Sequence, residues 1–523
     1  MIHPKFPHRL LYVLFIGLIA FGLSMGKSLM SIGVIAISAN WILEGKFKEK
    51  WHILKDRKFI PLVFLCFFLI HILWGLFSDN LEITLDDLRR KLPLLALPIT
   101  IGTSKKLVWK EIQIILQLFL LGLITSAGVG FYKFYHHDYE NYRDLSRFIS
   151  HIRLGLFLGF GIGISAYLLN NTKNNLKWGY LFVIFYFLFF IKILGSGTGY
   201  LAGAIAIILS LISISRKSKT QWIYYSSLIA IALSTLLVIG KLYIEFNTFT
   251  TPREGVLENP PKYTAKMNLY EHYPEIEIYE NGYPLYMNYC PIEVEDGWNS
   301  RSIIPIDSLD KKGQRIQGTI LRYMTSKGLM KDAEGIQQLT DEDIENIENG
   351  ISSILPPETG LEARIQETLL EYQMYKYQMN PNGHSLVQRL YYLDAGWNIF
   401  KNNPLFGVTI GSEESEYLSY YEKNNSLLDQ ENRLRAHNQF LSFLVCFGAV
   451  GFILIMFLLS YPVIKSPTSL LSTLFLVIIV IGFVSDDMLN RQAGVTFMAL
   501  FYSLIYLSDL PLKRDDIISD SVN

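Results

Sequence analysis

The sequence predicts an all-α polytopic membrane protein with about twelve transmembrane helices and one large, mainly helical outer loop. Three observations lead to this prediction. Of the 523 residues, 50% are hydrophobic and only 18% are charged, a balance too apolar for an ordinary soluble protein. The apolar residues fall in long blocks, most of them close to the roughly 20 residues that cross a bilayer as a helix. A single polar segment, about 241–436, interrupts the blocks.

Nine apolar blocks precede the polar segment and three follow it. They cover 10–25, 28–44, 59–77, 91–103, 112–131, 152–170, 177–194, 198–215 and 222–240, then 437–460, 468–485 and 492–508. The first block resembles a signal peptide but lacks an obvious small-residue cleavage site, so we expect an uncleaved membrane helix. The predicted domains are a membrane domain at 1–240, an outer loop at 241–436, a second membrane domain at 437–510 and a cytoplasmic tail at 511–523.

Cations in the short connections indicate the orientation. Lys and Arg gather near the N-terminus, in 46–58, in 105–110, in 216–219 and at 513–514, whereas the intervening connections include acidic stretches. Because Lys and Arg are retained on the cytoplasmic side during insertion, both termini are predicted to be cytoplasmic. The long polar segment between the ninth and tenth helices then faces outward.

This outer loop is predicted to be a folded acidic module. It contains about 30 acidic and 18 basic residues, and it is rich in Tyr, which disordered segments lack. Two stretches near its end, 360–379 and 385–403, have a helical pattern. Of the three cysteines only Cys290 lies in the loop, so we expect no disulfide framework, and no metal site is indicated.

Several short motifs follow one another at the end of the loop. Arg389, Leu393 and Trp397 recur at a spacing of four, which places them on one face of a helix. Pro404-Leu405-Phe406-Gly407 comes next, then His437-Asn438 where the chain re-enters the membrane, with Leu441 four residues after the His. The apolar helix that follows contains Gly448 and Gly451.

This order of motifs, on about twelve helices with one large outer loop, resembles the O-antigen ligase family. The resemblance covers most of the chain, although it does not explain an insert at about 250–380. It implies a glycosyltransferase of the bacterial inner membrane with its large loop in the periplasm. The implied partners are membrane lipids, a polyprenyl diphosphate glycan donor and an acceptor such as lipid A core, with no nucleic acid. No metal or other cofactor is implied.

Two residues suit the implied reaction. A diphosphate leaving group develops negative charge, and a guanidinium can meet two phosphate oxygens with a permanent charge, which makes Arg389 the candidate phosphate ligand. A sugar hydroxyl needs its proton removed as it attacks. A histidine with a pKa near 6.5 can remove it at neutral pH, so His437 is the candidate base. Direct displacement would invert the anomeric centre. Without the resemblance, His437 would be read as capping the membrane helix.

The other candidate substrate-binding residues depend more heavily on the resemblance. Many relatives carry an Arg where this chain has Thr198, so a phosphate ligand is missing. The cations predicted to compensate are Arg153, Lys192, Arg89 and Arg90, the last two followed by Lys91. Asn438 and Trp397 complete the candidate set. For Trp397 core packing is the competing interpretation, and for Gly448 and Gly451 we expect close helix packing.

Alternative functions remain open at this point. An O-antigen polymerase or a protein O-oligosaccharyltransferase would use the same class of donor with another acceptor. A transporter or flippase would require repeated halves, interrupted helices and several ionisable residues near the midplane, whereas the sequence shows no repeat and His71 is isolated. A binding module on a membrane anchor is a further alternative.

Overall fold

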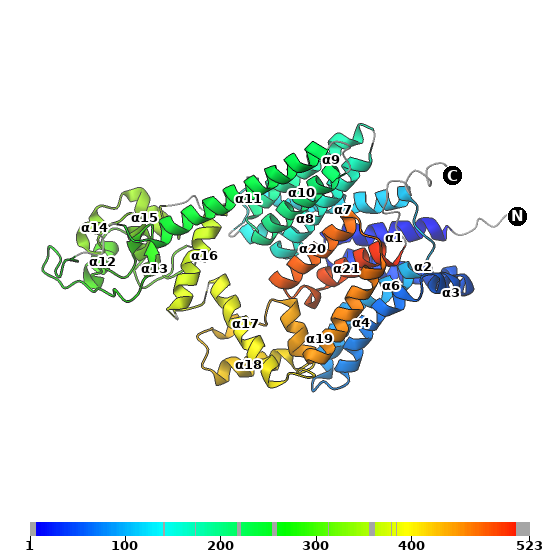
Figure 1. Ribbon diagram of the computed structural model, residues 1–523. Coiled ribbons are helices and arrows are strands. Elements are labelled where there is room, and N and C mark those ends of the chain that lie inside the picture. Colours follow the sequence, from blue (N-terminus) through cyan, green and yellow to red (C-terminus); the bar gives the residue numbers. More distant parts are fainter. Residues whose placement is uncertain are drawn as a thin grey trace. The chain divides into compact units, whose positions relative to one another are not determined.

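The computed structural model is predominantly helical, which confirms the predicted class (Figure 1). It describes residues 7–139, 142–172, 174–216, 221–253, 259–311, 313–354, 361–377, 379–382 and 384–508. Contacts divide the chain into two units, the first formed by Met1–Leu228 with Arg389–Asn523 and the second by Ile229–Gln388. Residues 389–436, assigned to the outer loop from the sequence, therefore pack with the first unit.

Every predicted apolar block is helical in the structure. The nine blocks before the polar segment correspond to α1 (His8–Gly22), α2 (Lys27–Glu44), α4 (Ile60–Gly75), α6 (Pro93–Gly102), α7 (Trp109–Tyr135), α8 (His151–Asn171), α9 (Leu176–Leu194), α10 (Gly197–Arg216) and α11 (Gln221–Thr250). The last three correspond to α19 (Gln439–Lys465), α20 (Leu470–Ser485) and α21 (Gln492–Tyr502), which continues as a π-helical turn, Ser503–Leu507.

Fewer helices than predicted are long and apolar enough to cross a membrane on their own. Among the described residues these are α7, α8, α9, α10 and α19. Helix α2 meets the same test together with α3 (Phe47–Asp56), at a bend of 109°. Helices α1, α4, α20 and the segment Gln492–Leu507 are apolar but shorter. The membrane character is confirmed, whereas the number of crossings remains a prediction.

Two helices lie in connections that the sequence analysis treated as polar loops, α3 and α5 (Leu81–Lys91). The Asn80 side chain caps α5 by accepting a hydrogen bond from the Ile83 N–H at 3.1 Å. Ion pairs four residues apart, Asp86 with Arg90 and Asp87 with Lys91, add to its stability. Such short amphipathic helices are easily mistaken for loops, because their polar residues interrupt the hydropathy signal.

Helix α8 lies at the centre of the first unit and is buried along most of its length. It packs against α9, α10 and α20. Glycines allow its backbone to approach α10 closely, since a Cβ at Gly155 would lie 2.9 Å from the Gly199 Cα, and one at Gly159 would lie 2.5 Å from the Ala202 Cβ. This packing fixes the first turns of α8 and α10 against each other, where two predicted site positions, 153 and 198, lie.

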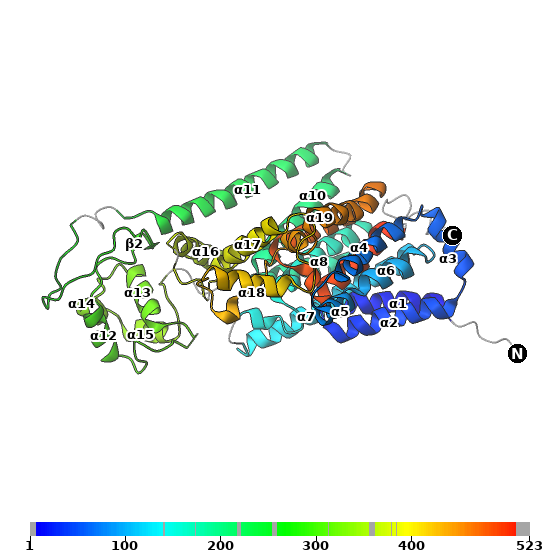
Figure 2. The same ribbon diagram turned by 90° about the horizontal axis from the view of Figure 1, so that it is seen from below.

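The second unit, Ile229–Gln388, has its own core. Helices α12 (Pro291–Asn299), α13 (Ile316–Ser326), α14 (Ala333–Gln337) and α15 (Asp341–Glu348) gather together, with α16 (Leu361–Lys376) following in the chain (Figure 2). Trp298, Ile320 and Ile347 are fully buried among them. A short antiparallel pair, β1 (Tyr279–Glu280) and β2 (Tyr283–Pro284), completes the unit. Its buried Glu280 carboxylate is paired with Arg322 at 2.9 Å.

Candidate active site

The predicted motifs meet where a loop docks into a break in α19. Gly448 has a left-handed backbone (φ 63°), which interrupts the helix and leaves carbonyls before it and N–H groups after it without helical partners. The loop after α17 (Ser385–Asn402) satisfies them. Val408 N donates to Val445 O at 2.8 Å and Thr409 N to Cys446 O at 3.1 Å, while Ala449 N donates to Pro404 O at 2.8 Å.

Only glycine fits at this crossing. A Cβ on Gly448 would lie 2.3 Å from the Leu405 carbonyl carbon, and a Cβ on Gly407 would lie 2.4 Å from the Val445 oxygen. The Trp74 indole N–H of α4 holds the same loop by donating to Phe406 O at 2.8 Å. The Pro-Leu-Phe-Gly motif and the glycine of the membrane helix therefore form one interlocked structure, which fixes α17 relative to the start of α19.

His437 lies immediately before the start of α19. Its backbone is left-handed (φ 46°). The next residue, Asn438, caps the helix, because its Oδ1 accepts from Leu441 N at 3.0 Å, while its Nδ2 donates to Val484 O at 3.1 Å. The second bond ties the start of α19 to the end of α20. This brings His437 beside the residues that follow α20.

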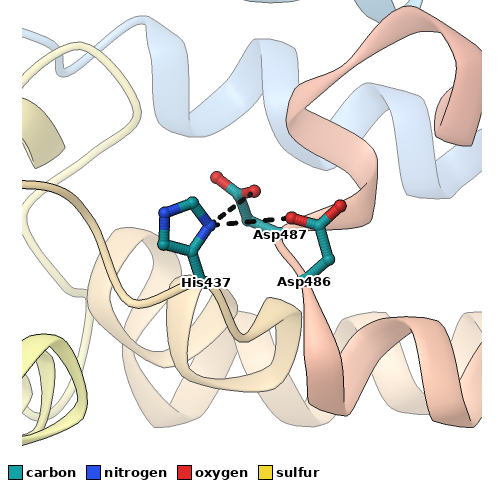
Figure 3. A group of neighbouring side chains, drawn as sticks. All are labelled: His437, Asp486 and Asp487. Atoms are coloured by element: carbon teal, nitrogen blue, oxygen red, sulfur yellow. Dashed lines mark ion pairs between the residues drawn. The ribbon is translucent and has the colours of Figure 1, made fainter. Parts of the chain in front are cut away.

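Those residues are two buried carboxylates, Asp486 and Asp487, with exposures of 3% and 5%. His437 Nδ1 lies 3.7 Å from an oxygen of each, and the other ring nitrogen lies on the far side of the ring (Figure 3). The separation is longer than a hydrogen bond, so the contact is an ion pair. The His437 side chain keeps 32% exposure, so the ring is partly accessible from outside.

Two arginines balance the carboxylates. Arg153, at the start of α8, pairs with Asp486 at 2.9 Å, and Arg435 lies 4.0 Å from Asp487. Arg435 also pairs at 2.9 Å with Glu413, the first residue of α18 (Glu413–Lys423). Charges buried without partners cost several kcal/mol, so each of these groups depends on its neighbours.

The charges around His437 change its protonation. Burial alone would lower the pKa of His437, but Asp486 and Asp487 outweigh burial and raise it to about 9. Burial likewise opposes ionisation of Asp487, but His437 and Arg435 together hold the Asp487 pKa below its usual range. The expected pKa near 6.5 for His437 is therefore wrong: the ring is an imidazolium at neutral pH in the resting protein, because two carboxylates face it.

A second layer of charge lies under this group. A small cavity of about 20 Å³, room for about one water molecule, is lined by Arg435, Glu413 and Asn490 together with residues of α4 and α5. There the Lys91 ammonium donates to Asp87 at 2.6 Å, and both side chains are almost fully buried. Alternating positive and negative groups thus extend from His437 into the membrane domain.

The comparison with known families bears on this segment of the chain. Residues 358–456 match a family whose description is O-antigen ligase. We call residues 358–456 the O-antigen ligase segment because of this similarity. Among curated proteins, none matches the chain. The matched residues include α17, the docking loop, α18, His437 and the first half of α19, so the family resemblance predicted from the motifs is confirmed. The match supports a membrane glycosyltransferase-like ligase role.

Within the O-antigen ligase segment, α17 carries Arg389 and, one turn later, Tyr392. The Tyr392 ring lies 5.6 Å from the His437 ring. Burial raises the pKa of Tyr392 to about 12, and the positive charge of Arg389 acts in the opposite direction. Trp397, further along the helix, is 46% exposed. Core packing of Trp397 is therefore wrong, and its indole is available at the surface.

The structure separates the predicted compensating cations. Arg153 joins the His437 group, and Thr198, where the resemblance led us to expect an Arg, donates to Ile152 O at 3.4 Å. Ile152 is the residue immediately before Arg153, so Thr198 contacts the backbone next to Arg153. Arg90 lines the small cavity and pairs with Asp86 at 2.9 Å. Arg89 and Lys192 are exposed, and no contact between them and His437 is found in the described part of the chain.

Four residues of the site had no predicted role. Glu413, Arg435, Asp486 and Asp487 come together only in three dimensions. The available signals were an acidic pair at the end of an apolar block and an Arg two residues before His437. Asn438 was predicted to contact substrate, and in the structure both ends of its amide are occupied by backbone groups; its contact with substrate remains a prediction.

The side chains of His437, Asp486 and Asp487 also resemble a set of metal ligands. His437, Asp486 and Asp487 offer ligand atoms that all lie within 4.8 Å of one another, and nitrogen with carboxylate oxygen suits a divalent ion. Arg153 and Arg435 already supply positive charge to both carboxylates. These cations disfavour a further cation there. The metal-independent reaction expected from the resemblance remains a prediction.

Proposed function

We propose that this protein transfers a glycan from a polyprenyl diphosphate carrier to a hydroxyl group of an acceptor, lipid A core being the acceptor that the resemblance favours. The observation that carries the proposal is the orientation of His437 within the O-antigen ligase segment. Its Nδ1 faces two buried carboxylates, and its other nitrogen lies on the far side. This is the orientation of a base held by carboxylates.

In the proposed reaction the acceptor oxygen attacks the anomeric carbon as the bond to the diphosphate oxygen breaks. The hydroxyl proton passes to the free nitrogen of His437, and polyprenyl diphosphate leaves. One displacement inverts the anomeric centre. Asp486 and Asp487 stabilise the imidazolium that forms, as the paired carboxylate does in other base dyads.

We assign binding of the diphosphate to Arg389, with Arg153 in the position left by Thr198. Arg389 precedes Tyr392 by one turn of α17, and the Tyr392 ring lies 5.6 Å from the His437 ring. A guanidinium can donate two parallel hydrogen bonds to phosphate oxygens. Trp397, exposed two turns further along α17, offers a face on which a sugar ring can stack.

The proposal is tested in a strain that lacks its own copy of the protein. We expect the wild-type chain to restore glycan on the lipid acceptor, and Arg389→Ala to leave most glycan on the polyprenyl carrier, with transfer reduced about 10- to 100-fold, the loss of roughly 1.5–3 kcal/mol expected for a charged hydrogen bond. Lys401→Ala is the matched control, because it removes an exposed cation from the same helix. Membrane abundance of all three chains is compared by immunoblot.

Each outcome of this test decides something. Restored transfer to lipid A core by the wild-type chain supports the ligase. Longer lipid-linked glycans, or glycan on protein, would identify a polymerase or a protein glycosyltransferase instead. If Arg389→Ala transfers as well as Lys401→Ala, Arg389 does not bind the donor.

The pKa of His437 predicts the pH dependence of the reaction. Only the neutral imidazole can accept a proton. With a pKa of about 9, His437 is neutral in about one molecule in a hundred at pH 7. The transfer rate of the purified protein is therefore expected to rise with pH, nearly tenfold per unit, and to level off above about 9. A rate that falls above this pH would mean that the imidazolium is the active form.

Asp487→Asn provides the matching perturbation. It removes one of the two negative charges that raise the pKa of His437, so the rate should level off at a lower pH than in the wild type. Glu82→Gln changes an exposed carboxylate on α5 and serves as the control. An unchanged profile in Asp487→Asn would contradict the assignment of the titration to His437.

A further inference from the structure

A second cavity, separate from the His437 group, opens among the first three helices of the chain. It has a volume of about 600 Å³ and lies between the start of α1, the end of α2, α3 and the turn 103–106 that follows α6. This size is within the range of small-molecule sites. Its lining contains five cations and two anions: Arg9, Lys46, Lys50, Lys105 and Lys106, with Glu44 and Glu49.

Part of this lining is held rigidly by the protein itself. The Arg9 guanidinium donates to the carbonyls of Lys105 and Lys106 at 3.1 and 2.8 Å and pairs with Glu111. Lys50 is only 5% exposed, and its ammonium donates to Trp41 O at 2.5 Å and lies 4.5 Å from the centre of the indole ring. A lining that is already ordered loses little entropy when a ligand binds.

The cavity has an excess of positive charge. Five cations face two anions in the lining, and Glu111 just outside it offsets the charge of Arg9, so an excess of two positive charges remains. Lys46 and Lys50 share the single carboxylate of Glu44, at 3.3 and 3.2 Å. Lys106 is exposed, and its ammonium forms no ion pair with any residue in the described part of the chain. The Lys46 side chain is 55% exposed despite its pair with Glu44, so the ammonium groups of Lys46 and Lys106 are both accessible to an anion from outside.

Helix α3 indicates where the cavity lies relative to the bilayer. It turns away from α2 by 109°, so it runs along the membrane surface if α2 crosses the membrane. Its outward side carries exposed aromatic rings at Phe47 and Trp51, with Phe59 just after the helix, and the Lys55 ammonium lies 5.7 Å from the centre of the Trp51 ring. Exposed aromatic residues beside lysines are typical of a helix at the level of lipid headgroups.

We propose that this cavity binds the phosphate headgroup of an anionic phospholipid from the leaflet on which α3 lies. The proposal combines the excess positive charge, the two accessible ammonium groups and the interfacial position. It is independent of glycan transfer, because none of the lining residues belongs to the His437 group. From the cations of the short loops we expect this leaflet to be the cytoplasmic one.

The test uses the full chain in detergent with equal amounts of phosphatidylglycerol and phosphatidylcholine, and counts bound lipids by native mass spectrometry. We expect the wild-type chain to retain phosphatidylglycerol preferentially. In the double variant Lys46→Gln, Lys106→Gln that preference should fall about tenfold, since each cation near a lipid surface contributes appreciably to binding. The double variant Lys48→Gln, Lys110→Gln changes the same two segments outside the cavity and should bind as the wild type does.

Three results would overturn the proposal. Unchanged preference in the cavity variant would show that the lipid binds elsewhere. An equal loss in the control variant would indicate a diffuse basic surface. Displacement of phosphatidylglycerol by millimolar inorganic phosphate would identify a site for free phosphate. Thermal unfolding checks that the variants fold, and the single variant Lys106→Glu, at an exposed position, repeats the test if the double variant is unstable.

Discussion

His437→Ala is expected to reduce glycan transfer by about 10²- to 10⁴-fold, the usual contribution of a positioned base. The reason is local, because the carboxylates of Asp486 and Asp487 face Nδ1 and lie on the other side of the ring from the nitrogen that is proposed to accept the proton. Asp486 and Asp487 retain Arg153 and Arg435 as counter-charges in the variant. We therefore expect the protein to fold and to remain in the membrane.

The measurement is the initial rate of transfer by purified protein at matched concentration, together with the unfolding temperature. His52→Ala is the control, because His52 is an exposed imidazole on α3, outside the O-antigen ligase segment. If the His437 variant transfers at the rate of the control, the proposed base is wrong. If it loses both transfer and fold, His437→Gln separates the two effects, since its amide can still donate to a carboxylate but cannot accept a proton at neutral pH.

Gly448→Ala is expected to cost about 3 kcal/mol or more in the free energy of unfolding. The backbone at this position is left-handed (φ 63°), and the added Cβ would meet the Leu405 carbonyl carbon at 2.3 Å. The backbone strain and the clash both destabilise the contact between the docking loop and α19, because the clash is relieved only if the loop moves away from α19. Transfer should be lost as well, since the loop connects α17 to the rest of the first unit.

Thermal unfolding in detergent, followed by circular dichroism, measures this effect. Gly179→Ala is the matched control: Gly179 lies in the apolar helix α9, its φ is not left-handed, and nothing lies within 4 Å of an added Cβ. We expect the control to unfold at the wild-type temperature or slightly above it, because Ala favours helix. Equal stability of the two variants would show that the loop is not anchored at Gly448.

The requirements of the loop and of the charges explain why the motifs occur in their observed order. The loop at 404–407 fixes the end of α17, and the Asn438 cap fixes the start of α19 against α20. Between these two anchors Tyr392 meets His437. The motifs thus hold three helices in one arrangement, and only a few of their residues face the proposed substrate.

Membrane helices were predictable because their signal is local. Each apolar block from 10–25 to 492–508 coincides with a helix, since the cost of unpaired backbone groups in lipid leaves few other conformations. The same reasoning missed α3 and α5. Their polar faces interrupt the apolar pattern, so the hydropathy of the sequence predicts loops there. In α5, the pair of Asp86 with Arg90 and the Asn80 cap favour a helix. The break at Gly448 was also missed. Close helix packing was expected there, but the left-handed backbone of Gly448 interrupts α19 and lets the loop at 404–407 approach.

For the site, the sequence by itself determined the residue types and their order: Arg389, then the glycine-containing loop, then His437 at a membrane helix. These are properties of a contiguous segment and are visible along the chain. The tertiary structure alone decided which charges meet His437, because Asp486, Arg153 and Glu413 come from three separate elements. It also decided the protonation of His437, since a pKa depends on the distance to neighbouring charges and on burial, which sequence spacing does not give.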